Sequence, residues 1–353
     1  MLNDRVTKID NKTLGLGYPV LIAAEVGINH NGDMNLAHQA IDAAAAAGAD
    51  AVKFQNYETS DFLEGNNLSY TYESQGQKVT ESQWEMFKRC ELSVTQLAEL
   101  KKHCDQVGVI FFSTPTSEAG IEILQRLKCP VLKNGSDFLT NLDLVQTMAK
   151  TGIPTILSTG MATVAEIDDA VTTFREAGGS DLILLHCTSS YPTPPADINL
   201  KRIPTLANTF GCISGFSDHS EGIVAAIGAV TLGACFIEKH FTVDRSLPGP
   251  DHRFSSDPDQ FKELVQAIRM IEKALGNSQL RPTASEQESR KDFRLSCQAK
   301  TSLRAGTVLQ KEHISYRRPG TGIPPKLALA ILGLSVKHDV PGGHVLKWED
   351  FHG

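Results

Sequence analysis

The sequence predicts an α/β protein: a (β/α)8 TIM barrel followed by a small β-rich domain. Short apolar or β-branched runs alternate with longer segments in which apolar residues recur every three or four positions, the patterns of strands and helices. Eight such pairs fill about 250 residues, the usual size of this barrel. A doubly wound sheet is the alternative, but no GxGxxG fingerprint accompanies the units, and this favours the barrel.

Eight runs are predicted as barrel strands because they are short, apolar and bounded by turn-forming or polar residues. In chain order they are Val20–Gly27, Ala51–Asn56, Val109–Pro115, Val131–Ser136, Pro154–Gly160, Leu182–Ser189, Cys212–His219 and Cys235–Thr242. Helical periodicity, often closed by a glycine, predicts helices that include Met34–Ala49, Thr95–Gly108, Leu142–Gly152, Val164–Gly178, Glu221–Ala234 and Pro258–Gly276.

The chain divides after the last helical pattern, which stops at Gly276. The barrel is therefore predicted over residues 1–276. The polar, proline-containing stretch at 277–292 has the composition of an interdomain linker. Residues 293–353 contain short strand-like pieces, turns and several prolines, and we expect a compact β-rich domain there, too small to hold a catalytic pocket alone.

Composition excludes several classes of protein. With 353 residues and 41% hydrophobic content, the chain can bury a large core. The net charge is −7 and no block of Lys and Arg occurs, so a nucleic-acid partner is not expected. No signal pattern and no membrane-length apolar run is present. Seven cysteines without CxxC spacing indicate a reduced, cytoplasmic protein without a disulfide framework or zinc knuckles.

Polar residues gather at the carboxyl ends of the predicted strands, where the active site of such a barrel lies. Alternate strand residues point to one side, which pairs Lys53 with Gln55, Ser217 with His219, and Glu238 with His240. The other strands contribute Glu25, Thr114, Lys133, Ser136, Ser158 and Ser189. One such residue alone would be an ordinary hydrogen-bonded core residue. Eight strands that each carry one predict a site, because unpaired buried charges are costly.

The stretch Gly215–Phe254 places His219 and His240 at the ends of two strands joined by a helix. Parallel strands with a crossover helix end at the same edge, so the two imidazoles should lie side by side. Neutral imidazoles can hold a divalent metal. With two protein ligands the metal would be exchangeable, and Mn2+, Mg2+ and Co2+ are all suitable. For His219 alone, a helix N-cap or a core hydrogen bond is the alternative.

The composition of the site also predicts the ligand. Lys53 and Lys133, with the surrounding hydroxyl groups, supply positive charge and donors for a phosphate dianion. Glu25 and Asp251 can accept hydrogen bonds from sugar hydroxyls or act as acid–base groups.

At these motifs the chain closely resembles the sialic acid synthase family. The resemblance rests on AEVGINHNG (Ala24–Gly32), GADAVKFQ (Gly48–Gln55), FFSTP (Phe111–Pro115), ILSTGMAT (Ile156–Thr163), HCTSSYPTP (His186–Pro194), GFSDHS (Gly215–Ser220) and IEKHFTVDRSLPGPDH (Ile237–His252). YRRPGTGIPP (Tyr316–Pro325) resembles the antifreeze-like SAF domain of that family. These enzymes condense phosphoenolpyruvate with an N-acylated mannose-type sugar and make nine-carbon 2-keto acids.

The resemblance implies roles for individual residues. Glu25, Lys53, His219 and His240 would be catalytic, and the metal on the two histidines, with Mn2+ expected first, would polarise the sugar aldehyde. The carboxylate and phosphate of phosphoenolpyruvate would be held by Lys53, Lys133, Thr114, Ser136, Ser158, Ser189 and Ser217. The sugar would contact Glu25, Gln55, Tyr191 and Asp251. Arg318 would reach the N-acyl group in the partner subunit, which implies a domain-swapped homodimer.

Phosphate would leave by C–O cleavage after water adds to C2. The sugar would be N-acetylmannosamine or a 2,4-diacetamido-2,4,6-trideoxyhexose, and two departures from the family pattern bear on that choice. Where the family usually shows a pattern like KIGSGE, this chain has KNGSDF, so Phe138 replaces an acidic residue. One hypothesis is that Phe138 faces a deoxy carbon and favours the 6-deoxy sugar; the alternative is that Asp137 takes over the acidic role. The second departure is Ser189, where some members have Asn.

Three other readings stay open. The chain could be a phosphoenolpyruvate–aldose synthase that makes seven- or eight-carbon keto acids, although the SAF-like tail argues against this. It could serve spore-coat or capsule polysaccharide synthesis with another aldose. It could also be a non-enzymatic SAF protein that binds carbohydrate or ice. The last reading predicts a broken site, yet none of Glu25, Lys53, Lys133, His219 and His240 is missing.

Overall fold

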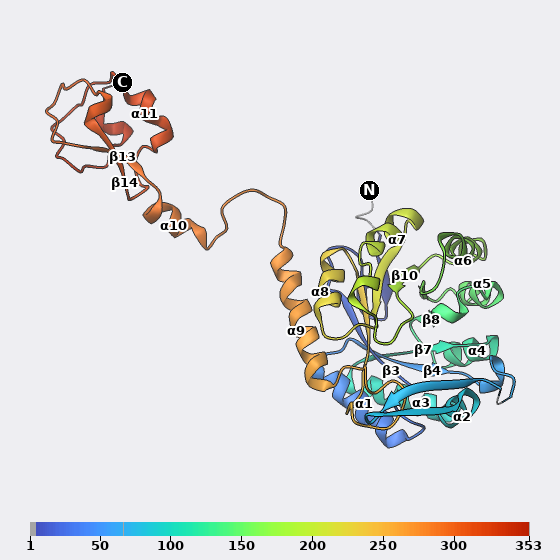
Figure 1. The fold of residues 1–353 in the computed structure, drawn as a ribbon. Helices are drawn as coiled ribbons and strands as arrows, with labels where there is room; N and C mark the ends of the chain where they lie inside the picture. The colour runs from blue at the N-terminus through green and yellow to red at the C-terminus, as the bar shows by residue number, and fades with distance from the viewer. Residues whose placement is uncertain (1–4, 66, 353) are drawn as a thin grey trace. The chain divides into compact units, whose positions relative to one another are not determined.

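The computed structural model describes residues 5–65 and 67–352. The chain forms two compact units, Met1–Gly276 and Asn277–Gly353. In the first unit, eight parallel strands close into a barrel in the order β3-β4-β7-β8-β9-β10-β11-β12 (Figure 1). This confirms the predicted fold class.

Each barrel strand lies inside its predicted run. The strands are β3 (Leu21–Gly27), β4 (Ala51–Asn56), β7 (Ile110–Pro115), β8 (Leu132–Asn134), β9 (Thr155–Ser158), β10 (Leu182–Cys187), β11 (Ile213–Asp218) and β12 (Phe236–His240). Neighbouring strands are in parallel register; Glu25 of β3, for example, stands opposite Lys53 of β4.

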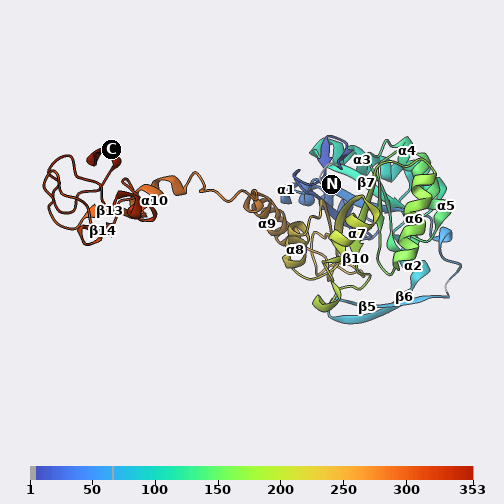
Figure 2. The ribbon, with the colours of Figure 1, turned by 90° about the horizontal axis from the view of Figure 1, so that it is seen from above.

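A helix follows each strand and covers the outside of the barrel (Figure 2). The eight are α1 (Met34–Ala47), α3 (Val94–Val107), α4 (Glu118–Arg126), α5 (Leu142–Lys150), α6 (Val164–Glu176), α7 (Arg202–Phe210), α8 (Val224–Thr231) and α9 (Pro258–Leu275). Local sequence sets their ends. The Thr163 side chain accepts the Glu166 N–H in a capping box at the start of α6, and Gly48 ends α1 in the left-handed conformation.

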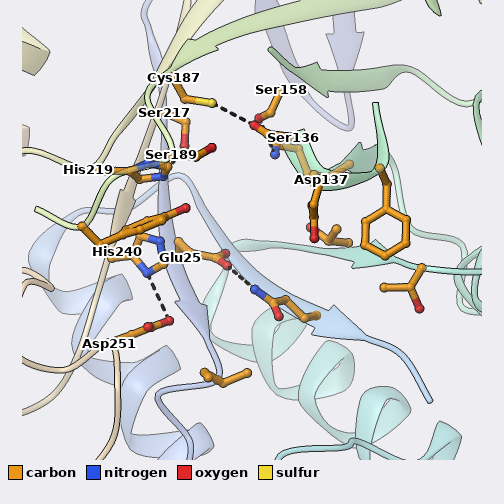
Figure 3. A pocket seen from close by; sticks show the side chains of 18 of the residues that line it. Glu25, Ser136, Asp137, Ser158, Cys187, Ser189, Ser217, His219, His240 and Asp251 are labelled. Atoms are coloured by element: carbon orange, nitrogen blue, oxygen red, sulfur yellow. Dashed lines mark hydrogen bonds and ion pairs between the residues drawn. The ribbon is translucent and has the colours of Figure 1, made fainter. Parts of the chain in front are cut away.

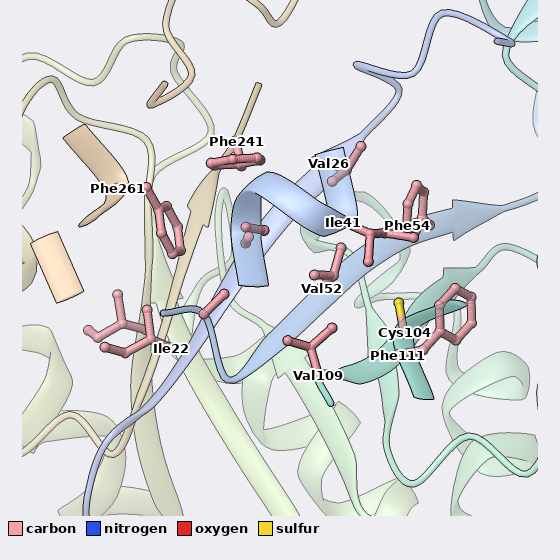
Figure 4. Close-up of a cluster of buried hydrophobic side chains, with 14 of the residues drawn as sticks. Ile22, Val26, Ile41, Val52, Phe54, Cys104, Val109, Phe111, Phe241 and Phe261 are labelled. Atoms are coloured by element: carbon pink, nitrogen blue, oxygen red, sulfur yellow. The ribbon is translucent and has the colours of Figure 1, made fainter. Parts of the chain in front are cut away.

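The main core lies between the strands and this helical layer (Figure 4). Ile22, Val52 and Phe111 from β3, β4 and β7 are buried together with Ile41 of α1 and Phe261 of α9. Because the outer strand face is apolar, the inner face is left to a second core and, at the carboxyl ends, to the polar residues of the site.

A hairpin, β1 (Thr7–Ile9) and β2 (Lys12–Leu14), closes the barrel at the end where its strands begin. Ile9 and Leu14 are fully buried, in one cluster with residues at the starts of the strands such as Leu21, Ala51 and Ile110. The short runs of this hairpin give no strand pattern from which it could be predicted.

A second insertion separates β4 from α3. It consists of the hairpin β5 (Ser69–Ser74) and β6 (Gln77–Ser82), followed by α2 (Gln83–Arg89). Gln75 and Gly76 both have positive φ, as a tight two-residue hairpin turn requires. Gln75 Nε2 donates to Ser246 O at 3.0 Å and Gly249 N donates to Ser74 Oγ at 3.2 Å, so the hairpin is tied to the loop after β12.

The second unit has its own apolar cluster, which includes Cys297, Ile331 and Leu346. Its elements are α10 (Glu286–Phe293), β13 (Ser296–Ala299), β14 (Ile314–Arg317) and α11 (Ala328–Ile331), and β13 pairs antiparallel with β14.

Three further sequence-based expectations can be compared with the structure. The segment predicted as a linker is partly helical, because α10 begins at Glu286. The Glu286 carboxylate accepts a hydrogen bond from the Thr283 N–H at 2.7 Å. The seven cysteines are free and buried. Among the described helices, none has the length and apolarity needed to cross a membrane.

We predict that Leu14→Ala lowers the free energy of unfolding of the barrel by about 2–5 kcal/mol, because it leaves a cavity under the strands. Leu16→Ala, on the same segment but 45% exposed, is the matched control and should cost about 1 kcal/mol or less. Urea unfolding measures both. Equal losses in the two variants would contradict the role of the hairpin as a plug.

Candidate active site

A cavity of about 420 Å³ opens at the carboxyl ends of the barrel strands. It is lined by all of the predicted site residues of the first unit: Glu25, Lys53, Gln55, Thr114, Lys133, Ser136, Ser158, Ser189, Tyr191, Ser217, His219, His240 and Asp251. Arg318 is not among the lining residues. It belongs to the second unit, where its guanidinium lies 5.0 Å from the centre of the Phe293 ring.

Two lysines and two glutamates that line the cavity form a buried charge network. Lys53 Nζ lies 3.1 Å from Glu25 Oε2 and 3.5 Å from Glu238 Oε2. Lys133 Nζ lies 3.8 Å from Glu238 Oε1 and donates to Ser158 Oγ at 2.7 Å. All four charged side chains are at most 6% exposed.

The two glutamates of this network differ in acidity. Burial raises the pKa of Glu25 to about 7, against the opposing pull of Lys53. Burial would also raise the pKa of Glu238, but Lys133, Lys53 and the Ser217 hydrogen bond lower it to about 2. Near pH 7, Glu238 is therefore fully ionised and Glu25 is partly protonated. Burial lowers the pKa of Lys133, whereas for Lys53 burial is outweighed by the two glutamates, which raise the pKa. A bound anion would favour the charged form of both lysines.

Hydroxyl groups surround one backbone position, Gly160. Its N–H donates to Ser136 Oγ at 3.0 Å. A Cβ at Gly160 would lie 2.5 Å from Ser189 Oγ, 2.7 Å from Ser136 Oγ and 2.9 Å from Cys187 Sγ, so only glycine leaves this cradle open. Converging hydroxyl donors beside lysines suit a phosphate group. Cys187 was not predicted as a site residue, although it points to the same side of its strand as Ser189.

His219 and His240 lie side by side on one side of the cavity (Figure 3), with ring centres 5.5 Å apart. His219 Nδ1 is 2.8 Å from the Thr188 carbonyl oxygen, to which it can only donate, so its Nε2 carries no proton in the neutral ring. Burial lowers the pKa of His219 to about 4 and that of His240 well below its usual value. Both imidazoles are therefore neutral near pH 7.

Two carboxyl groups lie near the histidines. Asp251 Oδ2 is 3.9 Å from His240 Nδ1, and burial raises the pKa of Asp251 to about 7. Gln55 Nε2 donates to Glu25 Oε1 at 3.4 Å. Gly27, at φ +53°, leaves room for that carboxylate, since a Cβ there would lie 3.0 Å from Glu25 Oε1. The Tyr191 ring packs against the two histidines, and its centre lies 4.3 Å from that of the His219 ring.

An ion pair on the outer side of the barrel fixes the backbone beside both histidines. Lys239 Nζ lies 2.9 Å from Asp218 Oδ2, and both side chains are buried. Asp218 Oδ1 accepts from the N–H and the hydroxyl of Ser220, and Lys239 donates to Ser220 O at 2.6 Å. The two residues that flank His219 in the chain, Asp218 and Ser220, are therefore fixed by these contacts.

The geometry suits a metal with two protein ligands and no more. Within the described part of the chain, no group of three or more His, Cys, Asp and Glu side chains is placed to hold a metal. His240 Nδ1 is buried there without a hydrogen-bond partner, and His219 Nε2 is unprotonated. Two neutral nitrogens of this kind fit a divalent ion whose other ligands are water and substrate. The metal stays a prediction.

One side of the cavity is apolar, and of its residues the sequence patterns indicate only Phe138. Its residues are Ile28, Tyr57, Phe62, Met86, Phe87 and Phe138, with Tyr70 beside them. Most come from the insertion after β4, where the Tyr70/Tyr72 alternation was an available strand signal. Phe138 and Asp137 both line the cavity, so the two hypotheses for this position stay open at this point.

Residues 40–280 match the NeuB family, and residues 296–352 match the SAF domain. The chain is 39% identical to N,N'-diacetyllegionaminic acid synthase of Legionella pneumophila, over 96% of each chain. It is 35% identical to the spore coat polysaccharide biosynthesis protein SpsE of Bacillus subtilis, over 97% of this chain and 96% of that protein.

A solved structure is also similar. The N-acetylneuraminic acid synthetase of Leptospira borgpetersenii, crystallised with citrate, superposes with a TM-score of 0.73 at 37% identity, over 81% of this chain and 95% of that one.

The raised pKa of Asp251 predicts a pH-dependent stability. A carboxyl group whose folded pKa is about 7 binds its proton more tightly in the folded state, so its stabilising contribution is full at low pH and is lost as the pH rises toward 7. Between pH 5 and 7 in chelator, the wild type should lose stability relative to Asp251→Asn by about 1 kcal/mol per pH unit. Chemical unfolding at several pH values measures the free energy of unfolding of both proteins. A difference between them that does not change with pH would contradict the raised pKa of Asp251.

Proposed function

The chain belongs to the NeuB family, and from this premise we propose that it is a nonulosonic (sialic-type) acid synthase. It condenses phosphoenolpyruvate with an N-acylated mannose-type sugar and releases phosphate, which is a transferase reaction of the EC 2.5.1 type. The observation that carries the proposal is the single cavity that joins a lysine-rich anion site to a pair of neutral histidines.

Phosphoenolpyruvate is the anionic partner in this proposal. Its phosphate and carboxylate would bind Lys53 and Lys133, with the hydroxyls around Gly160 as further donors. Hydrogen bonds between charged groups are short and strong, and buried lysines provide them without competition from water. Glu238, ionised and fixed by Ser217 at 2.9 Å, orients both lysines.

The sugar would enter above this anion. His219 and His240 would hold the metal, which supplies Lewis-acid polarisation of the aldehyde oxygen when bound. C3 of phosphoenolpyruvate forms a bond to the aldehyde carbon, whose oxygen takes a proton. Water adds to C2 and loses a proton, which leaves a hydroxyl and the phosphate on the same carbon. The C2–O bond to phosphate then breaks as this hydroxyl becomes the keto group, and its proton leaves with the phosphate.

Glu25 and Asp251 are suited to the two proton transfers. Both have a pKa of about 7, raised by burial, so each can give or take a proton near neutral pH. Glu25 contacts Lys53, and Asp251 lies beside His240, which puts one group near each substrate.

The similarity to SpsE supports one alternative: the same chemistry with another aldose, in the synthesis of a polysaccharide. The N-acyl contact of Arg318, the domain-swapped homodimer and the cytoplasmic location stay predictions.

We predict that the protein with Mn2+, phosphoenolpyruvate and an N-acylated mannose-type sugar releases phosphate and an equal amount of a nonulosonic acid. Mass spectrometry and phosphate release measure the two products. His219→Ala should lower turnover by at least about a hundredfold, since it removes one of two expected metal ligands. His103→Ala, on the surface of α3 and paired with Asp42, is the matched control and should keep full activity.

Two results would contradict the proposal. One is the absence of any nonulosonic acid with every sugar of an N-acylated mannose-type panel. The other is full activity of the wild type in chelator, which would remove the metal from the account.

A further inference from the structure

Three phenylalanines form a continuous surface in the cavity, which we call the aromatic wall: Phe62, Phe87 and Phe138. The ring centres of Phe62 and Phe87 are 5.1 Å apart, and those of Phe62 and Phe138 are 6.2 Å apart. Both pairs are edge-to-face, with interplanar angles of 85° and 86°, which is a favourable arrangement for aromatic rings. The wall is therefore a packed surface and not a set of isolated rings.

The aromatic wall faces the histidine pair across the mouth of the barrel. Phe138 ends the short 3-10 turn Ser136–Phe138 after β8, whereas His240 ends β12. In the closed strand order, β8 and β12 are four strands apart and so lie on opposite sides of an eight-stranded barrel. Figure 3 shows Ser136 and Asp137, the neighbours of Phe138, across the cavity from His219 and His240.

This placement fixes which part of a sugar meets the wall. The inference rests on the proposed function, in which the aldehyde carbon lies at His219 and His240. An open-chain hexose that begins there and crosses the cavity brings its sixth carbon, the one farthest from the aldehyde, toward the opposite side. The rings of the aromatic wall have no hydrogen-bonding group to offer a hydroxyl at that carbon.

We propose that the aromatic wall, through Phe138 in particular, selects an acceptor sugar with a methyl group at carbon 6, a 6-deoxy sugar, over one with a hydroxymethyl group. A hydroxyl turned into the wall would lose its water without gaining a partner. An apolar pocket discriminates against an added hydroxyl by up to about a hundredfold. The polar residues Asp137 and Gln83 also line the cavity and would meet substituents closer to the middle of the sugar chain.

A pair of sugars that differ at one atom tests this proposal. The substrates are N-acetylmannosamine and 2-acetamido-2,6-dideoxymannose, which lacks only the oxygen on carbon 6. For the wild type, kcat/KM should be about ten to a hundred times higher for the 6-deoxy sugar. Phe138→Gln, which offers a hydrogen-bonding amide, should reduce that ratio at least about fivefold by raising kcat/KM for N-acetylmannosamine. Phe138→Leu, the apolar control, should keep the preference of the wild type.

The outcomes separate this proposal from the one it rests on. Turnover of both sugars with equal kcat/KM, or a ratio unchanged in Phe138→Gln, would overturn the role of the aromatic wall and leave the synthase activity standing. No consumption of phosphoenolpyruvate with either sugar, or with any other N-acylated mannose-type sugar, would overturn both. Binding of phosphoenolpyruvate by each variant, measured by calorimetry, confirms that the substitutions leave the barrel folded.

Discussion

The buried network of Lys53, Lys133, Glu25 and Glu238 is the constraint on which the site depends. An isolated charge in a protein interior costs several kcal/mol, so these four groups must lie within reach of one another or of a ligand. The barrel register brings them together: Lys53 stands opposite Glu25 on adjacent strands, and Glu238 stands opposite Ser217, which donates to it. The same strand pairing that closes the barrel therefore also assembles the anion site.

The other features of the cavity follow from this network and its burial. Exclusion of water keeps His219 and His240 neutral and brings the pKa values of Glu25 and Asp251 to about 7. One buried space thus contains the lysines of the proposed anion site, the neutral nitrogens of the proposed metal site and two carboxyl groups suited to the proposed proton transfers. The aromatic wall adds selectivity at the far side without adding charge.

The sequence predicted the strands within three residues at each end and the inward-facing residues by parity, because apolar runs that end in polar residues carry both signals. It did not predict the β1–β2 plug or the aromatic wall, since these depend on contacts between distant segments. Ile9 is buried in one cluster with residues that are far apart in the chain, such as Ile156 and Phe236, and Phe62 meets Phe138 only after the barrel closes. Short hairpins and α10 also give weak patterns, and the roles expected for Arg318 and for a metal stay predictions.

Proton linkage can show whether the lysine–glutamate network binds the anion phosphoenolpyruvate. At pH 8 a phosphate group is fully ionised, whereas an anion bound beside Glu25 should raise the pKa of that carboxyl further above 7. Calorimetry in buffers of different ionisation enthalpy should therefore detect net proton uptake when phosphoenolpyruvate binds, and the uptake should shrink in Glu25→Gln. Absence of binding, or binding without proton uptake by the wild type, would contradict the account.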